Sequence, residues 1–208
     1  MKTLRLTESI DLVKKHGVKF AEQDEATTEK DLEKAIEKTG FPIAMKLVSS
    51  TITHKTDVGG VKINIKTISE AKKEFSKMKK LGGFEKVIVQ KMVRGTEIII
   101  GGKRDVQFGP TVLVGLGGIY VEIFKDFSIG ICPLSKRNAK EMIKELKAYP
   151  LLKGIRGKKG INISALEDEV VKVSKLMMKE KNIIELDLNP LIATDKEILA
   201  VDARIITD

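Results

Sequence analysis

Apolar residues recur along this chain at two spacings, and each spacing predicts a different kind of element. Spacings of three and four residues place apolar side chains on one face of a helix, and they recur over 7–16, 28–40, 69–81, 135–148 and 164–177. Short apolar runs of strand length lie at 18–20, 43–48, 61–65, 86–92, 97–101 and 183–189. Helices and strands are therefore mixed along the whole chain.

Hydroxyl side chains mark where the expected helices begin. Ser and Thr at the N-cap position accept a hydrogen bond from the first turn, and they open these segments as Thr7, Thr28, Ser69, Ser135 and Ser164. An acidic residue follows Thr28 and Ser164 at the spacing of a capping box. We therefore expect the helices to begin at these positions.

A loop rich in small polar residues separates the runs 43–48 and 61–65. It carries several hydroxyls, one histidine, His54, and the glycine pair Gly59 and Gly60. Small donors and glycines let a polyphosphate approach the backbone closely, so this loop predicts phosphate binding. Lys46 lies in the apolar run before it and either faces solvent or is held to meet an anion, because a buried unpaired ammonium is too costly. With that loop directly after it, we favour the anion-binding role.

Composition narrows the range of partners. The 208 residues are 42% hydrophobic and 32% charged, as in an ordinary soluble protein, and no apolar run approaches the ~20 residues of a membrane span. A net charge of +9 would suit a polyanion, but lysines alternate with glutamates as on solvated helices, and only 4% of residues are aromatic. The single cysteine fits a reducing compartment. We expect a cytoplasmic protein that binds neither nucleic acid nor membrane.

Several strings in the chain together resemble one known family. Ala44-Met-Lys, followed by HKTDVGGVK at 54–62, is similar to the HK[ST]DVGGVK motif of the ATP-grasp (beta) subunit of ADP-forming acyl-CoA synthetases, the acetate–CoA ligase group related to succinyl-CoA synthetase. KRDVQFGP at 103–110 resembles the RDPQFGP turn of that family, and GLGGIYVE and LLKGIRG follow in family order. The resemblance covers essentially the whole chain.

The resemblance implies a fold, a reaction and a partner. The fold would be α/β (α+β) of the ATP-grasp type, with an N-terminal helix (1–17), two subdomains (18–93 and 94–208) and nucleotide in the cleft between them. The enzyme would interconvert acyl-CoA, ADP and phosphate with carboxylic acid, CoA and ATP, using Mg²⁺. The chain lacks a dinucleotide-type CoA-binding segment, so a CoA-binding alpha subunit would complete a hetero-oligomer that is active only with both subunits.

The resemblance also assigns roles to individual residues. His54 would carry phosphate as phosphohistidine, while Lys46, Gly59 and Gly60 would contact the nucleotide phosphates. Further nucleotide contacts are implied at Gln90, Lys91, Met92, Glu97 and Arg156. From the residues alone, an ordinary turn at 90–92 is an equally good interpretation, whereas for Arg156 we slightly favour the functional role over a flexible basic loop.

Near the C-terminus, polar side chains fall at alternate positions of an apolar strand. Glu185, Asp187 and Asn189 would share one strand face, and their oxygens suit Mg²⁺, although a solvent-facing polar stripe has the same pattern. The string DLNPL resembles the DINPL motif of the family, in which the Asn and an Asp of the next strand hold the metal. These are Asn189 and Asp202; Asp187 stands where the usual pattern has a Glu.

Register arithmetic supports a shared metal without reference to any family. If Asp195 and Lys196 form a two-residue turn, the paired residue numbers sum to 391, and Asn189 lies opposite Asp202. Opposed residues project to the same face with Cβ atoms about 4.5–5.5 Å apart, which one cation can bridge. Two other functions remain open from the sequence, namely a different ATP-grasp carboxylate ligase and a non-catalytic nucleotide-sensing module.

Overall fold

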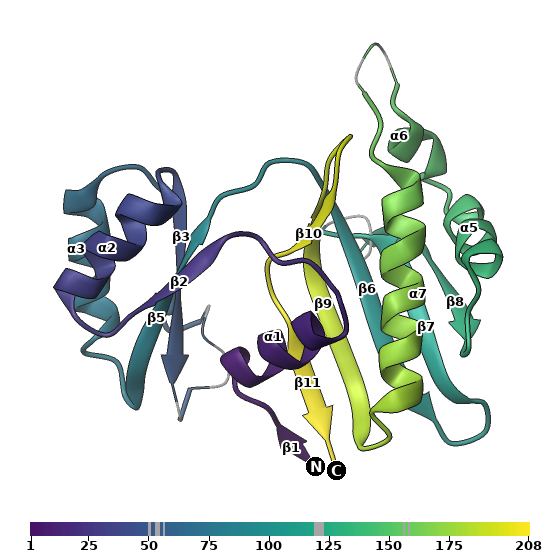
Figure 1. The fold of residues 1–208 in the computed structure, drawn as a ribbon, viewed down its shortest axis with the longest axis horizontal. Helices are drawn as coiled ribbons and strands as arrows, with labels where there is room; N and C mark the ends of the chain where they lie inside the picture. The colour runs from purple at the N-terminus through teal and green to yellow at the C-terminus, as the bar shows by residue number, and fades with distance from the viewer. Residues whose placement is uncertain (50, 53–54, 56, 119–122, 156, 158) are drawn as a thin grey trace. The chain divides into compact units, whose positions relative to one another are not determined.

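The chain forms two compact units. The computed structural model, drawn in Figure 1, describes residues 1–49, 51–52, 55, 57–118, 123–155, 157 and 159–208. Residues Ala21–Val93 form a smaller unit, and Met1–Phe20 together with Arg94–Asp208 form a larger one. The first helix is therefore part of the larger unit and does not stand apart.

The smaller unit is an antiparallel sheet with two helices packed on it. The strand order is β2, β5, β3, β4, and the bounds are β2 Gln23–Ala26, β5 Phe84–Lys91, β3 Ile43–Ser49 and β4 Val61–Ile65. Helices α2 (Glu29–Thr39) and α3 (Ile68–Met78) contribute Leu32 and Phe75 to its core. Ile43, Met45 and Leu47 of β3 are fully buried in this core. Side chains alternate along a strand, so Lys46 projects from the face opposite to these helices.

The larger unit is built on a seven-stranded sheet. Its order is β1, β11, β9, β6, β7, β8, with β10 paired to β9. The bounds are β1 Lys2–Thr3, β6 Thr96–Asp105, β7 Gly109–Leu116, β8 Phe127–Ile131, β9 Ile183–Ala193, β10 Ile198–Ala200 and β11 Arg204–Thr207. Every strand pair in it is antiparallel.

Helices of the larger unit cover one face of that sheet. Figure 1 shows α1 (Leu6–Lys15), α7 (Ile163–Lys179) and α5 (Lys136–Glu145) in front of the strands, with the short α6 (Tyr149–Lys153) nearby. A Cβ on Gly102 would lie 2.7 Å from Met177 Sδ of α7, so this glycine lets the helix approach the sheet. Ile98 and Ile100 lie on the same side and are fully buried. We call the opposite side, which carries Glu97, Gly101 and Asp187, the far face.

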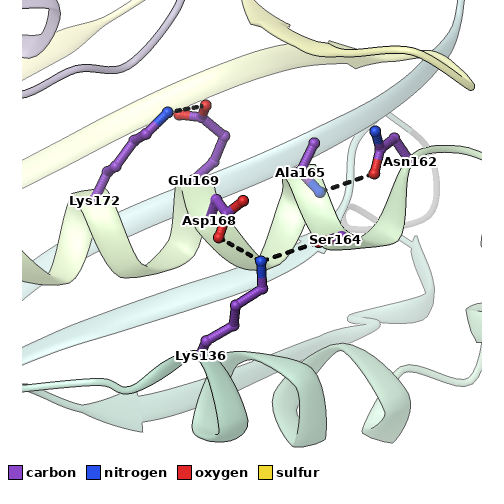
Figure 2. A network of polar contacts seen from close by, with 7 residues as sticks. All are labelled: Lys136, Asn162, Ser164, Ala165, Asp168, Glu169 and Lys172. Atoms are coloured by element: carbon purple, nitrogen blue, oxygen red, sulfur yellow. Dashed lines mark hydrogen bonds and ion pairs between the residues drawn. The ribbon is translucent and has the colours of Figure 1, made fainter.

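The predicted helix starts are right at two positions and wrong at three. Thr28 and Ser135 cap α2 and α5 through the N–H groups three residues on. Helix α1 begins at Leu6 rather than at Thr7, and Thr67 caps α3 in place of Ser69. Asn162 caps α7 in place of Ser164 (Figure 2). In the last two cases a second capping residue stands two positions earlier, and its side-chain oxygen satisfies the free N–H groups of an earlier first turn.

One expected strand is absent from the structure. Residues 18–20 form only an isolated parallel bridge between Phe20 and Ala200, with Ala200 N–H donating to the Lys19 carbonyl at 2.8 Å. The first strand of the smaller unit begins later, at Gln23. A three-residue apolar run carries too little pattern to fix which neighbour it pairs with.

Candidate functional site

Lys46 and Gln90 are buried polar residues on neighbouring strands of the smaller unit. Lys46 is 7% exposed and lies between Val61 of β4 and Ile88 of β5 in register. Gln90 is 2% exposed, and its Nε2 donates to Gln23 Oε1 at 2.9 Å. Both project from the face that α2 and α3 do not cover. A buried ammonium is stable only beside polar or anionic groups, so Lys46 suits an anion site.

Lys91 and Met92 continue the chain from β5. Lys91 is exposed, its Nζ lies 3.6 Å from Glu22 Oε2, and its N–H donates to the Glu22 carbonyl at 2.8 Å. The Met92 N–H donates to the Pro42 carbonyl at 3.1 Å. Since these two N–H groups are engaged within the unit, a nucleotide would use other groups of the same residues.

Glycine stands at positions 59 and 60, just before β4, for two different structural reasons. A Cβ on Gly60 would lie 2.9 Å from the Lys55 carbonyl oxygen and 3.2 Å from Leu47 Cβ, so the loop's own packing requires glycine there. Gly59 has φ +74°, and nothing lies within 4 Å of the place a Cβ would take. Gly59 therefore leaves room beside the backbone, as a phosphate-binding loop needs.

Glu97 lies on the far face of the larger unit, next to the glycine-rich segment at the end of β7. The Gly117 N–H donates to the Glu97 carbonyl at 2.8 Å, and a Cβ on Gly117 would lie 3.0 Å from Glu97 Cβ. A Cβ on Gly118 would lie 3.1 Å from Glu97 Oε2. Glycines at 117 and 118 thus let the chain pass directly over an exposed carboxylate.

The C-terminal hairpin has the register that the sequence predicts. Ile198 pairs with Ala193, and Ala200 with Leu191, so that each pair sums to 391 (198 + 193, 200 + 191). Beyond a short break, Arg204 pairs with Asp187, and 204 + 187 gives the same sum. Because the register is equal on both sides of the break, Asn189 and Asp202 fall opposite each other within it.

A bulge interrupts the ladder at the expected metal position. Ile98 pairs with Leu191 and Ile100 with Leu188, so Asn189 and Pro190 of β9 together face the single residue between those two on β6. The Asn189–Pro190 bond is cis. Bulges of this kind redirect a side chain out of the regular alternation, and here the redirected residues are the NP pair.

The carboxylates near this bulge interact electrostatically. Burial raises the pKa of the Asp187 carboxyl above its ordinary value of 3.8, and the negative charges of Glu185 and Asp202 raise it further, while Arg204 opposes them. Across the described ranges, no three His, Cys, Asp or Glu side chains converge to hold a metal. Asp187, Asp202 and the Asn189 amide would hold Mg²⁺ together with oxygens from a bound phosphate, which is its usual coordination.

A groove of about 290 Å³ lies beside the start of β6 in the larger unit. Arg94 and Lys159 make it basic, and Lys159 Nζ lies 3.3 Å from Asp195 Oδ2. The lining residues are Arg94, Gly95, Thr96, Lys159, Gly160, Ile161, Ala193, Thr194 and Asp195. Thr96, which lines this basic groove, directly precedes Glu97 in β6.

The chain matches one known protein family over almost its whole length. A family model described as an ATP-grasp domain matches residues 1–207. The chain belongs to the ATP-grasp family. The predicted fold class and the resemblance drawn from the sequence motifs are therefore confirmed.

Two relatives show how ATP-grasp chains of this kind are organised. The beta subunit of ADP-forming acetate–CoA ligase I from Pyrococcus furiosus is 44% identical over 96% of this chain and 89% of that protein. ADP-forming acetate–CoA ligase I from Archaeoglobus fulgidus is 38% identical over 96% of this chain, but only 30% of that longer protein is covered. The same domain therefore occurs both as a separate subunit and as part of a longer polypeptide.

Solved ATP-grasp structures agree with this fold closely. The acetyl-coenzyme A synthetase 1 of Candidatus Korarchaeum cryptofilum, in complex with coenzyme A and Ca-AMPCP, superposes with a TM-score of 0.93 at 39% identity, covering 100% of this chain and 94% of that chain. Among the described residues, no helix is long and apolar enough to cross a membrane.

The structure accounts unevenly for the expected site residues. It places Asn189, Asp202 and Asp187 together on one hairpin and gives Lys46 and Gln90 a shared sheet face. His54 and Arg156 lie outside the described residues.

Sequence reasoning missed two partners of the expected site residues. Arg204 lies opposite Asp187, and Gln23 accepts the hydrogen bond of Gln90. The arithmetic that paired Asn189 with Asp202 also pairs Asp187 with Arg204, so the first could have been found. The Gln23 contact joins strands 67 residues apart and left no local signal.

Proposed function

We propose that this chain is the nucleotide-binding subunit of an ADP-forming acyl-CoA synthetase, working in the cytoplasm. With a CoA-binding alpha subunit it converts acyl-CoA, ADP and phosphate to carboxylic acid, CoA and ATP, reversibly. The observation that carries the proposal is the 44% identity to an acetate–CoA ligase beta subunit across nearly the full length of both chains.

The proposed roles follow from what phosphoryl transfer requires. The transferred group is highly charged and needs positioning and charge neutralisation more than covalent help from the protein. Lys46 neutralises nucleotide phosphates, and Glu97, Gln90, Lys91, Met92 and Arg156 position the nucleotide. Asn189 and Asp202, with Asp187, would hold Mg²⁺, which supplies positive charge to the phosphate oxygens.

His54 is the proposed phosphate carrier. In a related Korarchaeum structure with Mg-AMPPCP, a phosphohistidine segment points towards the nucleotide binding site. Here, the phosphorus–nitrogen bond of the partner's phosphohistidine breaks as a new one forms to His54. A terminal phosphate oxygen of ADP then attacks that phosphorus, and His54 leaves as neutral imidazole. Splitting one transfer into two displacements in this way is ordinary nucleophilic catalysis.

One reconstitution experiment tests the function. The purified chain alone should bind ADP and form no ATP from acetyl-CoA, ADP and phosphate. Adding the CoA-binding subunit of the same source should start ATP formation that depends on Mg²⁺. ATP formation by the chain alone, or its absence when both subunits are present, would contradict the proposal. ATP-dependent ligation of a carboxylate to an acceptor other than CoA would indicate a different ATP-grasp ligase.

A further inference from the structure

The tip of the β6–β7 hairpin holds apolar side chains in solvent. Asp105 Oδ1 accepts hydrogen bonds from the N–H groups of Gln107 at 2.8 Å and Phe108 at 3.0 Å, and Gly109 has φ +75°. These features fix the turn. They do not explain why Val106 is 99% exposed and Phe108 62% exposed, because polar residues would fill the same positions of the turn.

A second set of exposed apolar residues lies on the neighbouring strand. Phe127, Ile129 and Ile131 of β8 are 41%, 57% and 54% exposed. The residues between them face α5, since a Cβ on Gly130 would lie 2.6 Å from Met142 Sδ and Ser128 Oγ donates to Glu145 Oε2 at 2.6 Å. One face of β8 is therefore covered by a helix, and the other presents three large apolar side chains.

Strand β8 ends beside the base of the hairpin that carries this tip. The Cys132 N–H, just after β8, donates to the Pro110 carbonyl at 2.9 Å, and Ile131 pairs with Thr111 at the start of β7. We call Val106, Phe108, Phe127, Ile129 and Ile131 the apolar edge. Strand β8 ends the strand order of the sheet, and an exposed apolar edge strand is a site of association unless something covers it.

The β8 residues of the apolar edge share a face with the proposed metal residues. Ile129 pairs with Leu113, Leu113 with Gly101, and Gly101 with Asp187. Directly opposed residues of antiparallel strands project to the same side, so this row lies on the far face. Three strand spacings of about 4.8 Å put Ile129 about 14 Å from Asp187 across the sheet. A protein bound at the apolar edge would lie beside the carboxylates that hold the nucleotide's metal.

We propose that the apolar edge is the docking surface for the CoA-binding alpha subunit, an inference that rests on the proposed function. That subunit must exchange phosphate with this chain close to a nucleotide whose proposed metal residues lie on the far face, whereas a second copy of this chain has no such requirement. In the Archaeoglobus relative this domain is 30% of the polypeptide, so the remaining part is more than twice its size and needs a substantial contact. A partner seated on β8 and the hairpin tip satisfies both conditions.

The test compares matched lysine substitutions on exposed strand residues. Ile129→Lys places a charge in the apolar edge, and Ile63→Lys on β4 is the control, because Ile63 is 59% exposed in the other unit. Phe108→Ser is a second variant, and it lies in the turn at the hairpin tip and outside the paired strands. Each purified chain is titrated with the purified CoA-binding subunit by calorimetry, ADP binding is measured on each chain alone, and ATP formation is assayed with both subunits.

The outcomes separate this inference from the proposed function. Ile129→Lys and Phe108→Ser should each weaken subunit affinity about 10- to 100-fold, as loss of a central apolar contact does, while ADP affinity and the Ile63→Lys control stay unchanged. Unchanged subunit affinity in both edge variants, with ATP formation intact, would overturn the docking surface and leave the function standing. Self-association of the unmodified chain that Ile129→Lys abolishes, without effect on subunit affinity, would assign the edge to a second copy. No ATP formation by the unmodified pair would remove both.

Discussion

At the scale of single residues, the proposed chemistry depends on cations that meet phosphate. Lys46 is the best placed of them in the described chain, because β3 buries it on the face that the core helices leave uncovered. Because the sheet restricts the Lys46 side chain, the position of its charge is set by the sheet.

Removing the Lys46 charge should weaken nucleotide binding without unfolding the protein. Lys46→Met keeps the length and apolar stem of the side chain, and we expect ADP affinity of the isolated chain to fall about 10- to 100-fold, the equivalent of a charge-assisted hydrogen bond of about 1.5–3 kcal/mol. Lys62→Met, on an exposed lysine of β4, is the control. Equal ADP affinity of Lys46→Met and the unmodified chain in calorimetry would show that Lys46 has another role.

The chain's two histidines provide an internal comparison. His16 Nε2 lies 2.8 Å from Glu180 Oε1, so His16, which follows α1, has a structural partner in the C-cap residue of α7. We expect radiolabelled ATP to give an acid-labile, base-stable phosphoenzyme that His54→Ala abolishes and His16→Ala retains. Labelling that survives His54→Ala would place the phosphate elsewhere.

At the scale of elements, the C-terminal hairpin carries the proposed metal residues on facing segments. The same residue sum describes β10 and β11 against β9, and the break between them lies at the β9 bulge. Two irregular segments therefore face each other at one level of the sheet, and the proposed metal ligands Asn189 and Asp202 belong to these segments.

Shortening Asp202 should raise the Mg²⁺ requirement selectively. In Asp202→Ala we expect the Mg²⁺ concentration for half-maximal ADP binding to rise at least about 10-fold, with metal-free ADP affinity retained. Glu185→Gln, on the facing strand β9, is the control, because Glu185 is assigned no metal bond. If ATP formation by Asp202→Ala kept the Mg²⁺ dependence of the unmodified enzyme, Asp202 would not be a ligand.

A buried carboxylate on α7 makes stability depend on pH. Glu169 is 4% exposed, its Oε1 accepts a hydrogen bond from Lys172 at 2.7 Å, and its Oε2 has no partner in the described structure (Figure 2). Burial raises the pKa of Glu169 above its ordinary value of 4.5, while Lys172 and Lys19 oppose the rise and Asp168 adds to it. The folded protein therefore holds this proton more tightly than the unfolded chain does.

The sign of the effect follows from that difference. A carboxyl with a raised folded pKa costs stability as pH rises from its unfolded value of 4.5 through the higher folded value. We expect the free energy of unfolding of the unmodified chain to fall relative to that of Glu169→Gln between pH 4 and pH 7. Denaturant titrations at both pH values measure this, and a difference that stays constant or moves the other way would count against it.

Helices and strands were easier to predict from the sequence than the contacts between them. The hairpins around 43–65 and 187–204 follow from alternation and turn chemistry, and both are found. Three helix starts were misplaced because Thr67 and Asn162 competed with later hydroxyls and because α1 begins before Thr7. Contacts that join distant strands, such as Gln23 with Gln90, depend on tertiary packing, which one sequence does not encode locally.

At the scale of the whole molecule, the net charge of +9 is an excess over many lysines that are paired with carboxylates. Lys38 with Asp24, Lys86 with Glu25 and Lys136 with Asp168 are ion pairs of 3.1, 2.6 and 2.7 Å. The carboxylate beside each of these lysines opposes its attraction for phosphate, whereas nucleic-acid binding relies on basic residues gathered on one face.

The affinity of the chain for DNA should therefore depend only slightly on salt concentration. We expect the logarithm of affinity for duplex DNA to fall with the logarithm of salt concentration with a slope shallower than about −2, corresponding to about two phosphate contacts. Fluorescence anisotropy at salt concentrations between about 50 and 200 mM measures this slope. A slope near −5 would indicate a true nucleic-acid interface.

The shared register of β10 and β11 on β9 makes chain length itself a constraint. Inserting or deleting one residue at 201–203 would shift Arg204 away from Asp187 and turn each later side chain of β11 to the opposite face, since the strand period is two. After an insertion, Arg204 would take the place of Ile205, which is now fully buried. Evolution can thus vary the residues of this segment one at a time, but it can change their number only by rebuilding the edge of the sheet.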